Sequence, residues 1–284
     1  MNSVSIVTPS YNQAQYIQET IESVQQQRYE NLTHHVIDGG SNDGTIDILN
    51  EYDDIEWISE PDRGQSHAIN KGFDRVNSDI VGWINSDDVY VFKRTIDDVV
   101  NAFKQTDADI VFGHALLIGP ASELLRSHYI PRFNKKKLER ICYIIQPSVF
   151  FRGYVVDENR LNEDREYSMD YEFWLDLAEQ YDWYRLDRII SADRNHPDRK
   201  IIKHSEQSYN DTQALRNERE IDQDAMFFLK QTIDKISLRW YRVRMLPQLL
   251  RLYQIPRDEF AFNFVRPSLP SVLRTQLLQR KKQL

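Results

Sequence analysis

Residues 79–88 read DIVGWINSDD, a short apolar run that ends in two adjacent aspartates. The run over 79–84 predicts a β-strand, because it is brief, apolar and bounded by polar residues. Upstream, strand-like runs alternate with stretches in which apolar residues recur at helical spacing. The expected strands cover 3–8, 34–38 and 56–59, and the expected helices follow a cap at Asn12 and cover 45–52 and 65–76. This alternation predicts an α/β fold with a Rossmann-like, mostly parallel mixed sheet flanked by helices.

The pattern becomes less regular after residue 118 and then helical beyond 205. Between these points the sequence predicts further strands and one strongly patterned helix. The remaining expected elements are strands at 109–117, 123–130 and 148–152 and helices at 94–105 and 168–181. We therefore divide the chain into a body, 1–204, with halves at 1–118 and 119–204, and a helical C-terminal extension, 205–284, with turns near Pro256 and near 267–270.

The composition is that of a globular protein, with 40% hydrophobic and 28% charged residues among 284. No stretch reaches the roughly 18 unbroken apolar residues that a membrane-spanning helix needs. The chain starts with MNSVSIVTPSYN, which has neither a basic leader nor an apolar signal core. We therefore expect a cytoplasmic location.

The net charge of −8 is distributed unevenly. Residues 201–284 hold 15 Lys and Arg against 9 Asp and Glu, a balance of +6, whereas residues 1–200 have a balance of −14. An acidic body is not what a nucleic-acid-binding protein presents, so we expect no nucleic-acid partner. The arginine-rich, apolar segment 237–253 has two interpretations that stay open: peripheral contact with an anionic membrane surface, or packing on the body.

Acidic or aromatic residues follow four consecutive predicted strands. Because the carboxyl ends of parallel strands meet at one edge of a sheet, we expect these side chains to share a crevice; they are Pro9, Tyr11, Asp38, Asp62, Asp87 and Asp88. A single aspartate after a strand is also a common turn former or helix cap. Adjacent buried carboxylates, however, repel each other, and one would be protonated unless a cation balanced them. Hard oxygens suit Mg²⁺ or Mn²⁺. The crevice is therefore expected to hold a metal together with a diphosphate.

Four stretches carry a family resemblance in their order and spacing. They read VSIVTPSYN (4–12), VIDGGSNDGT (36–45), SEPDRGQSHAINKGF (59–73) and IVGWINSDD (80–88). Together they resemble the motifs of family-2 inverting glycosyltransferases with the GT-A fold, and the likeness extends from residue 3 to about 196. The resemblance implies metal-dependent transfer from a nucleotide-diphosphate sugar, with a UDP-sugar expected first. The implied acceptor is a saccharide or a lipid-linked saccharide, as in bacterial enzymes that build surface polysaccharides.

The resemblance also implies roles for residues that contact the donor. Pro9 and Tyr11 would line the nucleobase pocket, with the Tyr11 ring available for stacking. Asp38 would accept a hydrogen bond from the imide N–H of uracil, and Asp62 would contact the nucleoside. By the same resemblance, residues 1–118 would bind the nucleotide sugar and residues 119–204 the acceptor.

Three further residues are implied in metal binding and chemistry. Asp87 would bind the ribose or the donor sugar, and Asp88 would hold the metal that bridges the diphosphate. His196 in RNHPD (194–198) is a candidate metal ligand, because neutral imidazole binds Mn²⁺ well. An inverting transfer also needs a base, and the motif SMDYEFWL (168–175) places it at Asp170. A helix N-terminal aspartate that complements the helix dipole is the alternative for Asp170.

The sequence departs from the family pattern at three positions. Ile69 stands where many relatives have an arginine, Asn85 where a longer acidic motif has aspartate, and Arg199 where serine is usual. The diphosphate contact of the missing arginine would then be absent or supplied elsewhere, for example by Arg63 or Lys71.

Two other functions remain open from sequence. A nucleotidyltransferase would share the sheet and the acidic metal ligands, but it would usually carry a Gly-rich, basic loop after the first strand. Residues 9–13, PSYNQ, have neither glycine nor a basic residue. The other alternative is a non-catalytic protein that binds nucleotide sugars or saccharides on the same scaffold, which a displaced Asp170 would favour.

Overall fold

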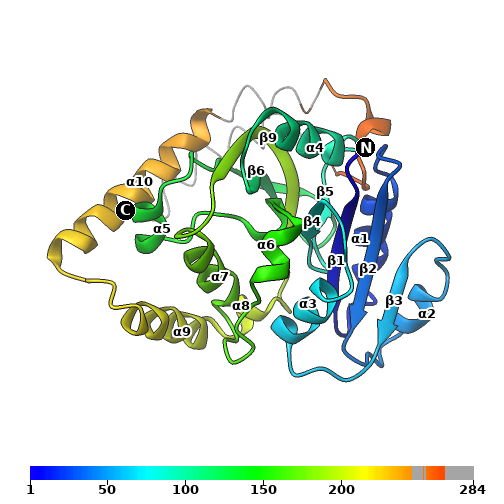
Figure 1. The fold of residues 1–284 in the computed structure, drawn as a ribbon, viewed down its shortest axis with the longest axis horizontal. Helices are drawn as coiled ribbons and strands as arrows, with labels where there is room; N and C mark the ends of the chain where they lie inside the picture. The colour runs from blue at the N-terminus through cyan, green and yellow to red at the C-terminus, as the bar shows by residue number, and fades with distance from the viewer. Residues whose placement is uncertain (245–251, 253, 266–284) are drawn as a thin grey trace.

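The computed structural model describes residues 1–244, 252 and 254–265. These residues form one nine-stranded mixed sheet in the order β3-β2-β1-β4-β8-β6-β9-β5, with β7 paired to β6 (Figure 1). The strands are β1 (Val4–Ser10), β2 (Leu32–Asp38), β3 (Glu56–Ser59), β4 (Ile80–Trp83), β5 (Val89–Tyr90), β6 (Ile110–Ile118), β7 (Leu124–His128), β8 (Val149–Arg152) and β9 (Trp183–Arg194). Strands β1 to β4 are parallel to one another, as are β6 and β9. Parallel neighbours of this kind bring several carboxyl ends to one edge.

Helices cover the sheet and continue into the C-terminal part (Figure 1). They are α1 (Ile17–Gln25), α2 (Thr45–Leu49), α3 (Gln65–Phe73), α4 (Thr95–Gln105), α5 (Lys135–Arg140), α6 (Gly153–Glu158), α7 (Met169–Leu177), α8 (Lys200–Lys203), α9 (Ser205–Glu218) and α10 (Ala225–Arg244). Two short 3₁₀ turns, η1 (Gln146–Ser148) and η2 (Arg257–Glu259), complete the set. The predicted α/β class with a mostly parallel mixed sheet is confirmed.

Two local expectations differ from the structure. Asn12 does not cap α1, which begins only at Ile17. Asn12 instead has φ 53°, and its Oδ1 accepts a hydrogen bond from the Asn42 backbone N–H at 2.9 Å, so it joins two loops. Strand β9 was not predicted, although its 12 residues make it the longest strand described. The expected turn at 267–270 lies outside the described residues.

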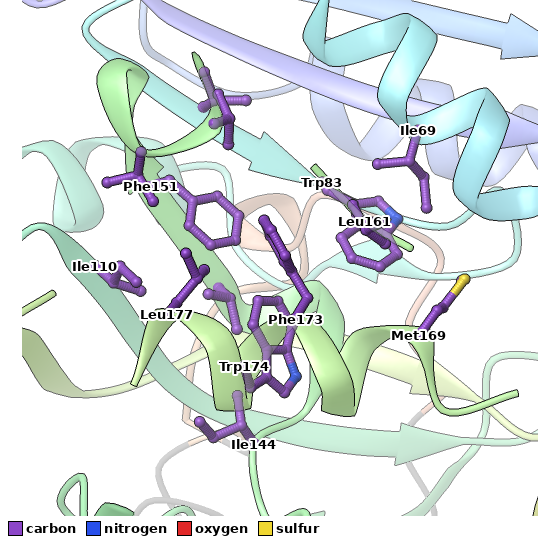
Figure 2. Packing of buried hydrophobic residues seen from close by; sticks show 14 of the residues in the cluster. Ile69, Trp83, Ile110, Ile144, Phe151, Leu161, Met169, Phe173, Trp174 and Leu177 are labelled. Carbon is purple, nitrogen blue, oxygen red and sulfur yellow. The ribbon is translucent and has the colours of Figure 1, made fainter. Parts of the chain in front are cut away.

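Aromatic side chains from α7 fix that helix against the sheet (Figure 2). Trp174 is fully buried and packs on Phe151 of β8, with ring centroids 5.9 Å apart, and on Trp83 of β4 at 6.2 Å. Phe173, also buried, contacts Phe151 at 6.0 Å. Because aromatic contacts of this size are strongly directional, α7 is held in one orientation, and its first turn reaches the edge where β4 ends.

Helix α3 lies close against β1 because of a single glycine. A Cβ on Gly72 would lie 2.2 Å from Cγ1 of Val7, so only glycine permits this approach. The contact brings the segment that precedes α3, including Asp62, beside the end of β1.

The C-terminal helices α9 and α10 pack against the body. Leu215 of α9 is fully buried in the same hydrophobic cluster as Trp174. Asp234 of α10 accepts from Nε of Arg140 at 2.7 Å and lies 3.4 Å from Nζ of Lys137. The predicted helical character beyond 205 is thus observed for these two helices. Among the described helices, none combines the length and apolarity that crossing a bilayer requires.

Candidate active site

A cavity of about 970 Å³ opens at the carboxyl ends of β1 and β4. It is also lined by the start of α7 and by the segment that follows β9. Six of the site residues expected from sequence line it: Pro9, Tyr11, Asp62, Asp87, Asp170 and His196. Residues separated by up to 187 positions therefore share one cavity. The two other expected residues, Asp38 and Asp88, are buried and are not among the lining residues in the described part of the chain.

Asp38 organises the turn that follows β2. Its Oδ2 accepts from the backbone N–H of Gly40 at 2.9 Å, from that of Ser41 at 2.8 Å and from the hydroxyl of Ser59 at 2.7 Å. The hydroxyl of Ser41 also donates to Oδ1. These bonds occupy both carboxylate oxygens within the protein. The expected contact between Asp38 and a nucleobase therefore stays a prediction, and the structure gives this residue a turn-forming role.

Asp62 and Tyr11 are accessible in the part of the cavity near that turn. The ring of Tyr11 is 59% exposed. Oδ1 of Asp62 accepts from the Gly64 backbone N–H at 2.8 Å, and its Oδ2 lies against Gly39, where a Cβ would come within 2.4 Å. Residue 39 must therefore be glycine if Asp62 is to occupy this place at the wall.

Asp87 and His196 meet at the cavity wall. Oδ2 of Asp87 and Nε2 of His196 are 3.0 Å apart, and the imidazole is 4% exposed beside the ring of Tyr16. Asp88 points into the protein, where its Oδ1 accepts from the Arg194 backbone N–H at 2.8 Å. Burial, followed by the nearby negative charges of Asp87 and Asp193, raises the pKa of Asp88 well above its usual value.

Two donor atoms at this wall are of types that bind divalent cations. Among the described residues, no group of three or more His, Cys, Asp or Glu side chains could hold a metal. Asp87 and His196 nevertheless bring one oxygen and one nitrogen donor together, a combination that suits Mn²⁺. The buried Nδ1 of His196 has no hydrogen-bond partner in the described part of the chain. Two protein donors suffice for an ion whose other ligands are phosphate oxygens and water.

Asp170 lies at the cavity wall in the first turn of α7. Burial raises the pKa of its carboxyl group to about 6, although the Tyr171 backbone N–H, which donates to Oδ1 at 2.7 Å, and the positive charge of Arg199 act in the opposite direction. Glu172 is not among the cavity-lining residues, and its Oε2 accepts from Nε of Arg165 at 3.2 Å. Within this motif, Asp170 is thus the carboxylate that faces the cavity.

Strand β9 and the segment after it contribute residues to which the sequence assigned no role. Arg194 is 1% exposed, and its Nε donates to the Asp87 carbonyl at 2.7 Å while its backbone N–H holds Asp88. Asp193 and Arg199 line the cavity as an ion pair, with Nη1 3.1 Å from Oδ2. The only signal in the sequence was their position on either side of His196.

The basic groups at the cavity differ from those suggested by sequence. Arg63 forms an ion pair with Glu163, Lys71 lies 3.1 Å from Glu60, and neither is a lining residue. The arginine and lysine side chains that line the cavity, within the described residues, belong to Arg199 and Lys200.

Solved structures with this fold include sugar transferases. The structure of S. aureus TarS 1–349 in complex with UDP-GlcNAc matches with a TM-score of 0.60 and 16% identity, over 75% of this chain and 65% of that one. The mannosyltransferase PcManGT from Pyrobaculum calidifontis, in complex with GDP-Man and Mn²⁺, matches with a TM-score of 0.61 and 15% identity, over 99% and 81% of the two chains. At these identities the likeness demonstrates the fold, and it confirms the predicted GT-A type.

Sequence comparison identifies the family. An uncharacterized glycosyltransferase of Rickettsia typhi is 26% identical over 208 residues, which cover 68% of this chain and 64% of that protein. The match thus spans just under two thirds of the relative's length. The model of glycosyl transferase family 2 matches residues 5–155, more than half of the chain and a range that includes nearly all of the four motifs. The chain therefore belongs to glycosyl transferase family 2.

Proposed function

We propose that this protein transfers a sugar, with inversion at the anomeric carbon, from a nucleotide-diphosphate sugar to a hydroxyl of a saccharide or lipid-linked saccharide acceptor. A UDP-sugar is the first candidate donor, and surface polysaccharide synthesis is the proposed setting. Family membership supports sugar transfer. The observation that supports the mechanism is Asp170, a carboxylate with a raised pKa in the same cavity as the Asp87 and His196 pair.

In this proposal the nucleoside binds beside Pro9, Tyr11 and Asp62. The exposed ring of Tyr11 offers a face for stacking on the base. Asp62 accepts a hydrogen bond from the base or the ribose, and Asp38 contributes by ordering the Gly39 turn next to Asp62.

We further propose that Mn²⁺ or Mg²⁺ is held by Asp87 and His196, with Asp88 supporting their loop through its bond to Arg194. When bound, the ion offsets the charge that develops on the departing nucleoside diphosphate. Arg199 adds a second positive charge at the cavity wall. It is a candidate for the contact that an arginine at position 69 would make.

Asp170 is proposed as the general base. As the acceptor oxygen bonds to the anomeric carbon, the bond from that carbon to the diphosphate oxygen breaks and the hydroxyl proton passes to the Asp170 carboxylate. A base with a pKa near 6 is ionised at neutral pH and still basic enough to take a proton from a hydroxyl that becomes acidic during attack.

A binding and transfer experiment separates this proposal from the two alternatives, a nucleotidyltransferase and a non-catalytic binding protein. Calorimetric titration with UDP, GDP, CDP and dTDP, each with Mn²⁺ or with chelator, identifies the nucleoside diphosphate and its dependence on the ion. We expect Asp87→Ala to lose the metal-dependent part of binding. Asp170→Asn should bind the same diphosphate and transfer sugar about 10²–10⁴ times more slowly.

Asp164→Asn is the matched control, because Asp164 is an exposed carboxylate outside the cavity. Full transfer by Asp170→Asn would eliminate the assignment of the base. If the wild type binds a nucleoside diphosphate tightly but transfers sugar to none of the tested acceptors, a binding protein is favoured. If it transfers a nucleoside monophosphate from a nucleoside triphosphate, a nucleotidyltransferase is favoured.

A further inference from the structure

Helix α10 carries large apolar side chains on its outward face as well as on the face that packs against the body. Gln231 and Asp234 face inward, where Nε2 of Gln231 donates to the Arg140 carbonyl at 2.7 Å and Asp234 accepts from the Arg140 guanidinium. Phe227 and Leu238 complete this inner face. An ordinary surface helix keeps its apolar stripe on the core side alone.

The outward face carries a continuous apolar stripe, which we call the α10 stripe. Its members recur at alternating spacings of three and four residues and are each between 48% and 64% exposed; they are Met226, Leu229, Ile233, Ile236 and Trp240. This spacing places them along one side of a helix. Figure 1 shows α10 at the outer edge of the molecule. A contiguous apolar surface of this kind marks a contact with another molecule or with a membrane.

Most of the charged residues within α10 are basic. Lys230, Lys235 and Arg239 are exposed on the same helix, and Nζ of Lys235 donates to Oε1 of Gln231 at 3.1 Å. The only acidic residue between 225 and 240 is Asp234, and it is engaged by Arg140 on the inner face. A second copy of the helix packed along the stripe would bring the two sets of cationic side chains together, which is unfavourable. Anionic lipid headgroups complement the same charges.

We propose that α10 docks on an anionic lipid bilayer, with the α10 stripe inserted at the boundary between headgroups and acyl chains. Apolar side chains bordered by lysine and arginine on one helix are the features that favour such interfacial binding. The proposal places the membrane contact on the outward face of α10, which includes the first part of the segment 237–253; residues 245–251 and 253 of that segment lie outside the described residues. It does not depend on the sugar-transfer reaction.

Docking in this way would place the active-site cavity near the bilayer. Helix α10 contacts α5, and the segment just after α5 contributes Ile144 and Ile145 to the cavity wall. A lipid-linked acceptor could then remain in the membrane while its saccharide enters the cavity.

The test is flotation of the full chain with two kinds of vesicle, phosphatidylcholine alone and phosphatidylcholine mixed with phosphatidylglycerol. We expect binding to the anionic vesicles only, and weaker binding at high salt because screening removes the electrostatic part. The triple variant Leu229→Ser, Ile233→Ser and Ile236→Ser should bind the anionic vesicles at least about tenfold more weakly. The reason is that three side chains no longer transfer apolar surface from water into the bilayer.

Two comparisons make the result specific. Ile202→Ser with Tyr209→Ser, which removes exposed apolar groups on α8 and α9, should leave vesicle binding unchanged. Lys230→Glu with Lys235→Glu should abolish the preference for anionic lipid. Circular dichroism checks that each variant is folded. Absence of wild-type binding, or equal binding by the stripe variant, would refute the proposal, as would sedimentation showing a dimer that the stripe variant dissociates.

Discussion

At the scale of single residues, Asp170 combines two opposing influences. Burial raises the pKa of its carboxyl group from 3.8 to about 6, and the charge of Arg199 limits that rise. A shift of this size corresponds to up to about 3 kcal/mol of disfavoured ionisation in the folded protein. The proposed general base requires a pKa near the working pH, and the environment of Asp170 raises its pKa in that direction.

We predict that kcat/KM for sugar transfer decreases as the pH is lowered through about 6, because protonated Asp170 cannot accept a proton. Since Arg199 lowers the pKa of Asp170, Arg199→Gln should move this acidic limb to higher pH, and Arg199→Lys should leave it nearly in place. The measurement is the pH profile of kcat/KM for the three proteins. Identical profiles for Arg199→Gln and the wild type would contradict the electrostatic link.

At the scale of elements, β9 does most to assemble the site. It pairs with β6 from Ile110 opposite Trp183 to Ile118 opposite Arg194, and so delivers Asp193 and Arg194 to the loop that holds Asp87. The first half of β9, WYRLDR, contains three charged residues and gives no clear strand pattern. Its pairing depends on a partner strand more than 70 residues earlier, so local periodicity could not reveal it.

Helix α10 is held on α5 by a small polar network, and its strength can be tested. We predict that Asp234→Ala costs about 1–2 kcal/mol, because Arg140 and Lys137 lose a partly buried partner. Limited proteolysis should then cleave the link between α9 and α10 faster. Thr232→Ala, on the exposed side of the same helix, is the control and should leave the cleavage rate unchanged.

At the scale of the whole molecule, the C-terminal helices share a hydrophobic core with the body. Leu215 of α9 is fully buried with Trp174 and Leu177 of α7. The division into a catalytic body at 1–204 and an extension at 205–284 therefore remains a proposal about function, and this shared burial links the stability of the two parts.

We predict that Leu215→Ala lowers the free energy of unfolding by about 2–5 kcal/mol, because it leaves a cavity beside the helix that carries Asp170. Denaturant titration measures this loss for the complete chain. Tyr209→Ala, at an α9 residue that is 64% exposed, should change stability by less than about 0.5 kcal/mol. Equal effects of the two substitutions would show that α9 contributes no shared core.

Several features could be predicted from sequence because their signals are local. Apolar periodicity and turn residues place β1 to β4 and α3 nearly where the structure has them. The order of the four motifs indicated the family and brought Pro9, Tyr11, Asp62 and Asp87 to one cavity. Each of these inferences depends on strand ends that parallel pairing must bring together.

The sequence by itself thus determined the α/β class, the family and the edge of the sheet where the site lies. Only the tertiary structure decided that Asp38 and Asp88 face inward while Asp62, Asp87 and Asp170 face the cavity. It also decided that Arg199 and Lys200 line the cavity instead of Arg63 and Lys71, and that α10 exposes a stripe of apolar side chains. The physical reason is that the direction of a side chain depends on partners distant in sequence, as when Arg194 holds Asp88 across 106 positions.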